Sequence, residues 1–467
     1  MHAFDPWTGG IATWEAMAAT VSSHATLKRL QSQRLTSLLT SAKGSALYRR
    51  ILDGRPAGSL HLEDLPIMNK AYLMANFHDW VCDPRLELAA LRQFIQDPSL
   101  IGSAYQGRFL VWESSGSHGA PGVFVQDAAA MAVYDALEAT RRRVPNLPLH
   151  LLDPWGVLDR IAFVGATNGH FASTVSVERL RRLNPFLSRA LQGISFLQPL
   201  PALARELVSF NPRVITTYPS VAIMLAEEKM RGKLDINPRE IWTGGETLTD
   251  AMRTAISQAF NAEVINSYGA SEFMSLAFEC AHQRLHLNSD WAILEPVDEM
   301  NRPVPIGQVG STTLLTNLAN HVQPIIRYDL GDRVSIASMP CECGSVLPVI
   351  EVQGRSGDLL HLGDRHGQAA VSALALSTVV ESIEELVDFQ LIQTAPNELE
   401  LNTELGGPMV DEALRRAKSA LDHYLTSQNL GRTQVSCNAA RPSVRGRNGK
   451  THRVIGIPNH DLLQWLA

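Results

Sequence analysis

A segment rich in glycine and serine follows the β-rich run Phe109–Trp112 and is the first candidate for chemistry along the chain. Its small and hydroxylated positions are Ser114, Ser115, Gly116, Ser117 and Gly119. Glycines allow tight turns that point successive backbone N–H groups inward, and hydroxyls add further donors, so this composition could hold a phosphate group. The segment lacks the Gly-Lys-Ser/Thr ending of a Walker loop. A flexible surface loop is the alternative interpretation.

Five further short segments combine turn residues with charged or aromatic side chains. They are Gly244-Gly245-Glu246, Tyr268-Gly269-Ala270-Ser271-Glu272, Arg327–Asp332, Gly354–Asp358 and Gly449–Arg453. Each segment alone could be an ordinary turn, and the charges of Glu272, Asp332 and Lys450 could simply be solvated. Their order and spacing as a set indicate parts of one site.

Three cysteines and a histidine form a second candidate group. Cys341 and Cys343 lie two residues apart, and Cys280 and His286 lie six apart, just beyond Glu272. This ligand set suits a closed, tetrahedral structural Zn²⁺ site without an open catalytic position. His282 is a competing ligand, and buried free cysteines are the alternative. The five cysteines of the chain are too few and too scattered for a disulfide scaffold.

The elements that must position these residues alternate between strands and helices from Phe109 onward. The β-rich runs are Phe109–Trp112, Ile161–Val164, Val214–Thr217, Glu240–Thr243 and Glu263–Ser267. Helical spacing is found over Ala128–Arg143, Val221–Arg231 and Asp250–Phe260. This alternation predicts parallel sheets covered by helices. The first hundred residues favour helices and loops.

The pattern changes to closely spaced strands after Gly310, which predicts a β-rich subdomain. Its expected strands are Ser311–Thr316, Ile325–Tyr328 and Arg333–Ala337. Beyond the charged stretch Gln353–Asp358, the sequence favours helices at Val371–Ile383 and Val410–Leu425 and strands at Leu386–Ile392 and Glu398–Leu405. We therefore expect an α/β fold, with a large domain over residues 1–353 and a small, mobile α+β domain over 354–467.

The composition is that of an ordinary soluble globular protein. Of 467 residues, 45% are hydrophobic and 19% are charged, and the net charge is -6. Without a basic excess, neither nucleic acid nor an anionic membrane is expected as the main partner. No apolar run approaches the roughly 18 residues of a membrane span, and the start lacks a signal pattern. We expect a cytoplasmic protein.

Taken in order, the segments resemble those of the adenylate-forming superfamily of acyl-CoA synthetases, adenylation domains and luciferases. The resemblance is strongest to the phenylacetate–CoA ligase branch, whose phosphate loop Ser-Ser-Gly-Thr-Thr-Gly is matched by residues 114–119. That branch also lacks the loop lysine of many relatives, and Gly122 stands there in this chain. Ser45–Arg50 and Asp64–Lys70 are similar to two more of its segments. The resemblance spans nearly the whole chain.

This resemblance implies an ATP-dependent ligase. Such an enzyme activates a carboxylic acid to an acyl-adenylate, transfers the acyl group to coenzyme A, and releases AMP and pyrophosphate. The first step depends on positioning and on charge neutralisation, for which a divalent cation and a lysine are the expected tools. Glu272 matches the Mg²⁺-binding glutamate, and Lys450 matches the lysine that reaches between the carboxylate and the α-phosphate.

The resemblance also assigns the nucleotide contacts. Tyr268 would stack on adenine, with Gly245 and Glu246 in the base pocket, and Asp332 would accept hydrogen bonds from the ribose hydroxyls. Arg355 would assist Asp332. The remaining phosphate and nucleotide contacts fall on Gly269, on Ser271, which replaces the usual threonine, and on the loop from Ser114 to Gly119.

Two half-reactions require two arrangements of the small domain, because Lys450 must withdraw before a thiol approaches. The matching pivot is Gly357, where many relatives have Asp or Lys. Glycine permits wide backbone rotation but provides no side chain that could latch one arrangement. The balance between the two arrangements is therefore open.

The acid pocket is expected near Phe163, Gly165, Tyr218, Pro219 and Ala270, where small residues beside aromatic ones suit a flat aryl acid. Several alternatives stay open. The acceptor could be a carrier-protein phosphopantetheine or an amine, the acid could be an unusual small one, or the chain could be a catalytically degenerate nucleotide-binding protein. A homodimer is a further expectation.

Overall fold

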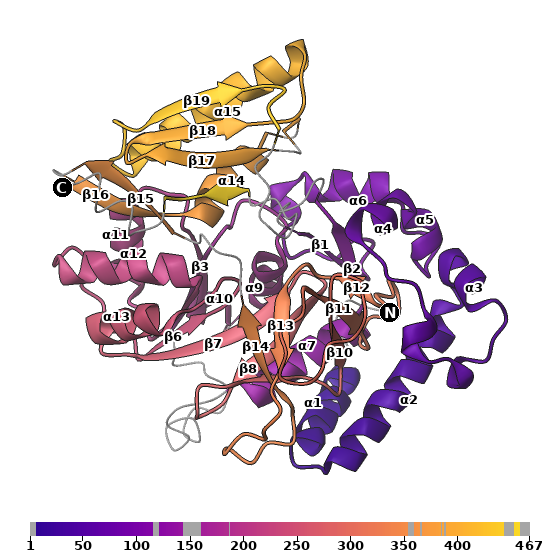
Figure 1. Ribbon diagram of the computed structural model, residues 1–467. Coiled ribbons are helices and arrows are strands. Elements are labelled where there is room, and N and C mark those ends of the chain that lie inside the picture. Colours follow the sequence, from indigo (N-terminus) through magenta and orange to yellow (C-terminus); the bar gives the residue numbers. More distant parts are fainter. Residues whose placement is uncertain are drawn as a thin grey trace.

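The computed structural model describes residues 6–114, 121–142, 160–185, 187–353, 359–364, 367–383, 385–386, 389–442 and 453–457. A nine-stranded sheet runs through the larger part of the molecule (Figure 1). Its strands, in spatial order, are β13 (Arg333–Ile336), β14 (Val349–Gln353), β9 (Leu285–Leu287), β8 (Phe273–Glu279), β7 (Glu263–Ala270), β6 (Glu240–Thr243), β5 (Val214–Thr217), β3 (Ile161–Gly165) and β4 (Leu191–Ser195).

The two halves of this sheet differ in strand direction. From β4 to β7 all neighbouring strands are parallel, whereas from β7 to β13 all are antiparallel. The parallel half needs crossover connections, and its helices provide them. These helices are α9 (Ala172–Leu183), α10 (Leu187–Ala190), α11 (Leu200–Phe210), α12 (Pro219–Met230) and α13 (Asp250–Phe260).

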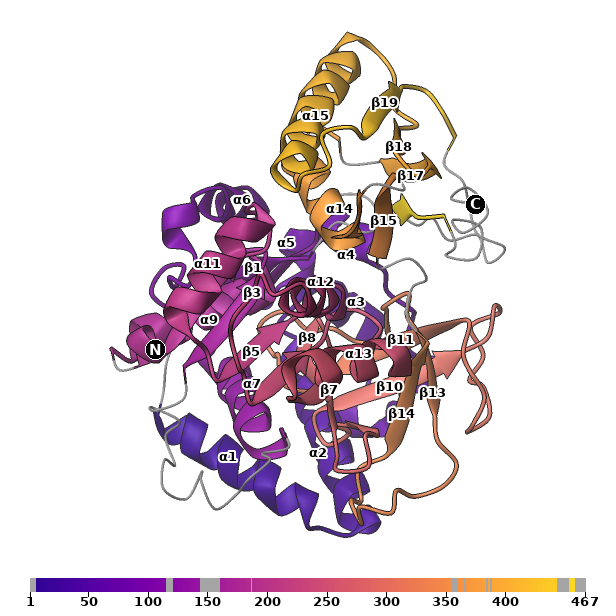
Figure 2. The ribbon, with the colours of Figure 1, turned by 90° about the vertical axis from the view of Figure 1, so that its left-hand side faces the viewer.

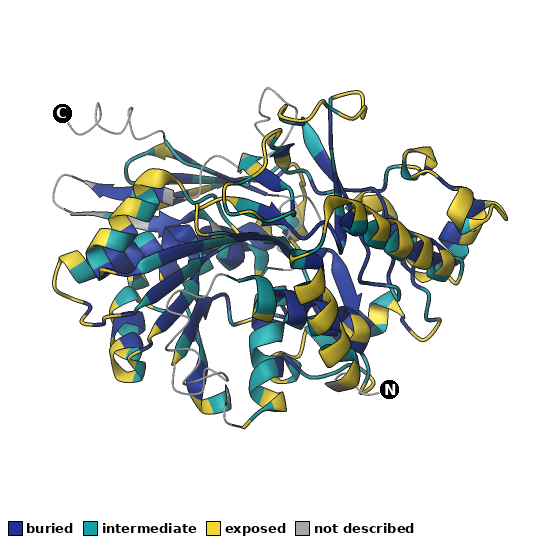
Figure 3. Ribbon diagram, turned by 90° about the horizontal axis from the view of Figure 1, so that it is seen from below, coloured by how far each residue is buried: buried dark blue, intermediate teal, exposed yellow. Residues whose placement is uncertain are grey.

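Helices pack against the parallel strands. Val164, Ile215 and Ile241 are buried in one hydrophobic cluster with side chains of α11, α12 and α13. Helix α7 (Ala128–Arg141) belongs to a second cluster, which also includes β8 residues. Figure 3 shows buried strands between helices whose outer sides are exposed. The helix-covered parallel sheet expected from the sequence is confirmed.

The N-terminal hundred residues form short helices, as expected. They are α1 (Pro6–Thr20), α2 (His24–Ala42), α3 (Ala46–Leu52), α4 (Lys70–Ala75), α5 (Phe77–Trp80) and α6 (Leu88–Ile95). Ser23, Ser45 and Asn69 cap α2, α3 and α4 by accepting a backbone N–H from the first turn of the helix. The buried Trp80 indole donates to the Pro324 carbonyl over 2.6 Å and so ties these helices to the β-rich region.

The β-rich region is not a separate unit throughout. Strands β10 (Ala292–Val297), β11 (Thr312–Asn317) and β12 (Tyr328–Asp329) form a three-stranded sheet, and β1 (Leu110–Glu113) pairs with β2 (Val123–Gln126). Strands β13 and β14, however, join the large sheet through β9. The strand expected at Arg333–Ala337 is found as β13, and it joins the large sheet because its partner β14 pairs with β9.

After residue 358 the described chain forms a small α+β unit (Figure 2). Its strands are β15 (Leu359–Asp364), β16 (Gly367–Ser372), β17 (Gln390–Ala395), β18 (Glu398–Asn402), β19 (Gln434–Asn438) and β20 (Val454–Ile455), and its helices are α14 (Ala373–Glu381) and α15 (Pro408–Ser427). Val371 and Ser372, expected in a helix, instead end a strand. Ser372 is the N-cap of α14 and accepts from the backbone of Ala375, so the helix begins at Ala373, two residues later than expected.

This small unit packs on α11 and α12 of the larger part. The Ser220 and Ser372 hydroxyls are hydrogen-bonded over 3.0 Å in a buried position. The Gln428 side chain donates to the Gln198 carbonyl over 3.0 Å and accepts from the Leu200 amide over 3.3 Å. Among the residues that the structure describes, no helix combines the length and apolarity needed to cross a membrane.

Candidate active site

A cavity of about 1420 Å³ opens near the carboxyl ends of β3, β5, β6 and β7. In open α/β sheets this edge is the usual ligand-binding position, because loops and helix N-termini converge there. Thr378 of α14 also lines the cavity, so the small C-terminal unit contributes to its wall. The residues expected from the sequence that line it are Ser114, Phe163, Tyr218, Gly245, Glu246, Tyr268, Gly269, Ala270, Ser271, Glu272 and Asp332.

The segment Tyr268–Glu272 contains the end of β7 and the two-residue turn, Ser271 and Glu272, that leads to β8. A Cβ atom at Gly269 would lie 1.9 Å from the Met274 carbonyl oxygen, so only glycine fits this close approach. The Trp112 indole donates to the Ser271 carbonyl over 2.8 Å, and the Asn317 amide donates to the Glu272 carbonyl over 2.8 Å. The turn is therefore held from two sides by residues of other strands.

Glu272 is buried, with 9% of its surface exposed. Burial raises the pKa of its carboxyl group; a hydrogen bond with the Tyr328 side chain opposes this rise, the charge of Asp332 adds to it, and the charge of Lys70 opposes it. A buried carboxylate beside a second carboxylate is a suitable oxygen ligand for a hard divalent cation, which would relieve both burial and repulsion.

Lys70 is a site residue that the sequence reasoning did not assign. It stands at the start of α4, lines the cavity, and its charge acts on Glu272. Its Cδ atom lies 3.3 Å from where a Cβ of Gly122 would stand. The signal was present in the similarity of Asp64–Lys70 to the ligase branch, but only the fold places this lysine beside the position from which the loop lysine is missing.

Ser114 and Gly122 close the base of the serine–glycine loop. The Ser114 hydroxyl accepts from the Gly122 amide over 2.9 Å, and the Ser114 amide donates to the Gly122 carbonyl over 2.9 Å. The loop residues Ser115, Gly116, Ser117 and Gly119 lie outside the described residues, as do Arg355, Gly357 and Lys450.

The side chains of Tyr268 and Asp332 contact each other in the cavity wall. The Tyr268 hydroxyl donates to an Asp332 carboxylate oxygen over 2.8 Å. Asp332 follows Gly331, whose φ of 75° turns the chain after β12. This arrangement presents an aromatic ring and a carboxylate on the same side of the cavity, which suits a nucleoside with a flat base and a diol.

Gly244, Gly245 and Glu246 continue from β6. Gly245 has a φ of 78°, and a Cβ at this position would lie 3.1 Å from the Tyr218 ring. The Glu246 carboxylate accepts from the Ser220 amide over 3.0 Å and thereby caps the N-terminus of α12. Burial raises the pKa of Tyr218 to about 12, so its hydroxyl is neutral near pH 7.

Two residues expected to line the acid pocket, Gly165 and Pro219, are not among the residues that line the cavity. Gly165 is not among the lining residues, and a Cβ there would lie 2.2 Å from the Phe163 ring, so this glycine makes room for that ring. Pro219 is buried in the first turn of α12 and likewise does not line the cavity. Phe163, Tyr218 and Ala270 do line it.

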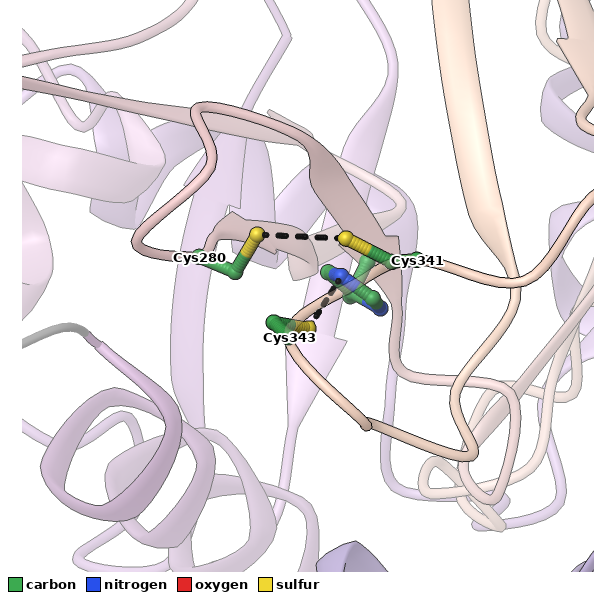
Figure 4. Close-up of side chains that lie close together, drawn as sticks. Cys280, Cys341 and Cys343 are labelled. Carbon is green, nitrogen blue, oxygen red and sulfur yellow. Dashed lines mark hydrogen bonds between the residues drawn. The ribbon is translucent and has the colours of Figure 1, made fainter.

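The four expected zinc ligands lie close together in the structure (Figure 4). They are Cys280, His286, Cys341 and Cys343. Their four potential ligand atoms lie within 4.8 Å of one another, with Cys280 Sγ 3.7 Å from Cys341 Sγ and Cys343 Sγ 3.3 Å from His286 Nε2. The edge of a tetrahedron with Zn–S bonds of about 2.3 Å is about 3.8 Å, so these spacings fit a tetrahedral site. The Leu347 carbonyl lies 2.8 Å from His286 Nδ1, which leaves Nε2 directed at the thiols. His282 is not part of this group.

Comparison with known proteins identifies the fold. No family model matches the chain. A solved 2-hydroxyisobutyryl-CoA ligase in complex with 2-HIB-AMP and CoA, in the thioesterification state, is 22% identical with a TM-score of 0.57, and the match covers 96% of this chain and 93% of that one. The same enzyme in the postadenylation state with R3-HIB-AMP has a TM-score of 0.53 at 20% identity, covering 96% of this chain and 92% of that one. The chain therefore has the fold of adenylate-forming ligases.

Two curated proteins are similar over part of the chain. Protein CapK of Staphylococcus aureus is 25% identical over 194 residues, which are 40% of this chain and 41% of that protein. A phenylacetate-coenzyme A ligase of Aromatoleum evansii is 28% identical over 159 residues, which are 32% of this chain and 36% of that protein. The matches thus span less than half of either relative, and the second supports the resemblance to the phenylacetate–CoA ligase branch.

Proposed function

We propose that the protein is an ATP-dependent, AMP-forming acid–CoA ligase similar to phenylacetate–CoA ligases. It activates a carboxylic acid to an acyl-adenylate and then transfers the acyl group to the thiol of coenzyme A. The observation that carries the proposal is the meeting of Tyr268, Asp332 and Glu272 with Lys70 and Ser114 around one cavity. These groups come from separate segments of a chain with an adenylate-forming fold.

The residues suit the first half-reaction. The acid's carboxylate oxygen attacks the α-phosphorus of ATP, the bond to the β-phosphate oxygen breaks, and pyrophosphate leaves. Attacking and leaving groups are both anionic, so the site must supply positive charge and fixed donors. Lys70 and the backbone of the serine–glycine loop are suited to this, while Tyr268 and Asp332 hold the nucleoside.

Glu272 is the residue that we expect to hold Mg²⁺ in this site. Its burial and the neighbouring charge of Asp332 make a cation partner favourable. The ion, when bound, neutralises phosphate charge. Cys280, His286, Cys341 and Cys343 are proposed to hold a structural Zn²⁺, which has no part in the chemistry.

The second half-reaction calls for a different arrangement of the C-terminal unit. We assign the catalytic lysine role to Lys450, a nucleotide contact to Arg355 and the pivot to Gly357, with the large domain at 1–353 and the small one at 354–467. The present packing of the small unit on α11 and α12 supports a rotation as a body, because the small unit makes each polar contact described there through the side chain of Ser372 or Gln428, and a rotation can break these contacts without unfolding either part.

The direct test is ATP–pyrophosphate exchange with a panel of aryl and hydroxy acids, followed by thioester formation on adding CoA. We expect exchange to depend on the acid and Mg²⁺, and thioester to form only with CoA. Exchange without thioester formation would indicate that the acyl acceptor is a carrier-protein thiol or an amine instead of coenzyme A. Nucleotide binding without exchange for any acid would contradict the enzyme function itself.

A further inference from the structure

The cavity wall contains a charged pair that the proposed reaction does not use. Glu138 and Arg142, four residues apart at the end of α7, form an ion pair, and both line the cavity. The Arg142 side chain is only 17% exposed. The Glu138 side chain is 36% exposed. An i,i+4 ion pair on an outer helix face would be unremarkable, but this pair lines the cavity.

One row of side chains on the large sheet also lines the cavity. Phe163 pairs with Thr216, and Thr216 pairs with Trp242, so the three side chains share one face of neighbouring parallel strands. All three line the cavity. The Arg142 guanidinium carbon lies 4.1 Å from the Trp242 ring centroid and 5.9 Å from that of Phe278. The pair therefore packs against this aromatic part of the wall.

The neighbouring contacts fix the two charged groups. The Ser275 hydroxyl donates to Glu138 over 2.9 Å, and the Trp242 indole N–H donates to Glu240 over 2.9 Å, which holds the ring on which Arg142 lies. A guanidinium has five N–H donors and a carboxylate has acceptor capacity for several bonds. The pair can thus both donate to and accept from a third group.

We infer that the acid carries a hydroxyl group at the end remote from its carboxylate, and that Glu138 and Arg142 recognise this hydroxyl. A hydroxyl can donate to Glu138 and accept from Arg142 at once. A purely apolar end would displace water from the half-buried Arg142 guanidinium without offering it a new partner. A second carboxylate would meet the charge of Glu138. Phe163 and Trp242 suit a flat ring between the two polar ends. This inference rests on the proposed function.

The test compares acids of similar size by ATP–pyrophosphate exchange. The probes are 4-hydroxyphenylacetate and 3-hydroxyphenylacetate, with 4-methylphenylacetate as the apolar analogue and 4-carboxyphenylacetate as the charged one. We expect kcat/KM for the better hydroxy acid to exceed both analogues about tenfold or more, because a site built to bind a hydroxyl discriminates strongly against its absence.

Variants separate recognition from folding. Arg142→Met and Glu138→Met should each bring the ratio of kcat/KM for the hydroxy acid to kcat/KM for the methyl acid close to one, because neither methionine can hydrogen-bond the hydroxyl. Arg108→Met is the matched control, because Arg108 lies over the Phe109 ring at 5.3 Å but does not line the cavity. Its preference should equal that of the wild type.

The outcomes are distinguishable. Equal use of hydroxy and methyl acids by the wild-type protein would overturn this inference and leave the proposed ligase intact. Equal loss of both acids in Arg142→Met, with melting temperature preserved, would also overturn it. Exchange with no acid at all would overturn the proposed function and this inference with it.

Discussion

Among single residues, Glu272 best shows how function and stability oppose each other in this site. Its carboxyl group is buried, near Asp332, and in hydrogen-bond contact with Tyr328. A group placed there for stability alone would be neutral or apolar. Its environment is favourable only when a cation is present, as the proposed Mg²⁺ role requires.

Glu272→Gln should therefore stabilise the protein without nucleotide and strongly lower its activity. The folded pKa is raised above the ordinary value of 4.5, so the stabilising contribution of protonated Glu272 is full below pH 4.5 and is lost as pH rises through the folded pKa. Above that pKa the variant should melt higher than the wild type, and exchange should fall about 10²–10³-fold.

Thermal denaturation as a function of pH, from below the ordinary pKa of 4.5 upward, measures the effect on stability, and the exchange assay measures the effect on activity. The control is Glu299→Gln, at an exposed side chain that does not line the cavity, for which neither property should change. A variant less stable than the wild type at every pH would show that Glu272 is a structural group and not a strained functional one.

At the scale of elements, the antiparallel half of the sheet links the turn at Glu272 to the cysteine cluster. Strand β8 leaves this turn and ends at Glu279, next to Cys280, and β9 carries His286. Gln283 and Arg284, between these two ligands, line the cavity. A metal at the cluster would therefore fix one wall of the active site.

We predict one Zn²⁺ per chain. Cys343→Ser should lose the metal and lower the melting temperature by several degrees, because a structural Zn²⁺ contributes directly to folding. Cys437→Ser is the control, since Cys437 lies in β19 and is not part of the cluster. Elemental analysis and thermal denaturation measure the effect, and wild-type protein without zinc after purification from zinc-containing medium would refute it.

At the scale of the whole molecule, the small C-terminal unit is held on α11 and α12 by a partly apolar and partly polar interface. Its hydrophobic residues belong to the same buried cluster as those helices, and Ser220 and Ser372 meet in that interface. If the two half-reactions require two arrangements, this contact must break once in each cycle.

A disulfide introduced by combining Ser220→Cys with Ser372→Cys should trap the present arrangement. The native hydroxyl oxygens are 3.0 Å apart, close enough for a bridge after small adjustments. Oxidised protein should retain at most one half-reaction, measured as exchange or as thioester formation from supplied acyl-adenylate, and reduction should restore the other. Full overall activity in the oxidised, cross-linked protein would contradict rotation; each single variant is the control.

The sequence alone determined the elements with strong local signals. Strands β5 and β6 and helix α13 begin and end at the expected residues, because their apolar periodicity and turn residues agree with their final surroundings. The same local signals indicated the residues around Tyr268, Glu272 and Asp332 and the four potential ligands of the cysteine cluster. At Gly269 the backbone admits only glycine, because a Cβ there would lie 1.9 Å from the Met274 carbonyl oxygen.

Only the tertiary structure decided what stands beside these residues. The sequence could not show that Lys70 lies beside Gly122 and that its charge lowers the pKa of Glu272. Nor could it show that β14 pairs with β9. It also could not show that Arg142 and Glu138 face the cavity, because an i,i+4 pair has the same spacing on a solvent-facing helix. Such neighbours depend on long-range packing, whose energy comes from which surfaces meet and not from the local pattern of either segment.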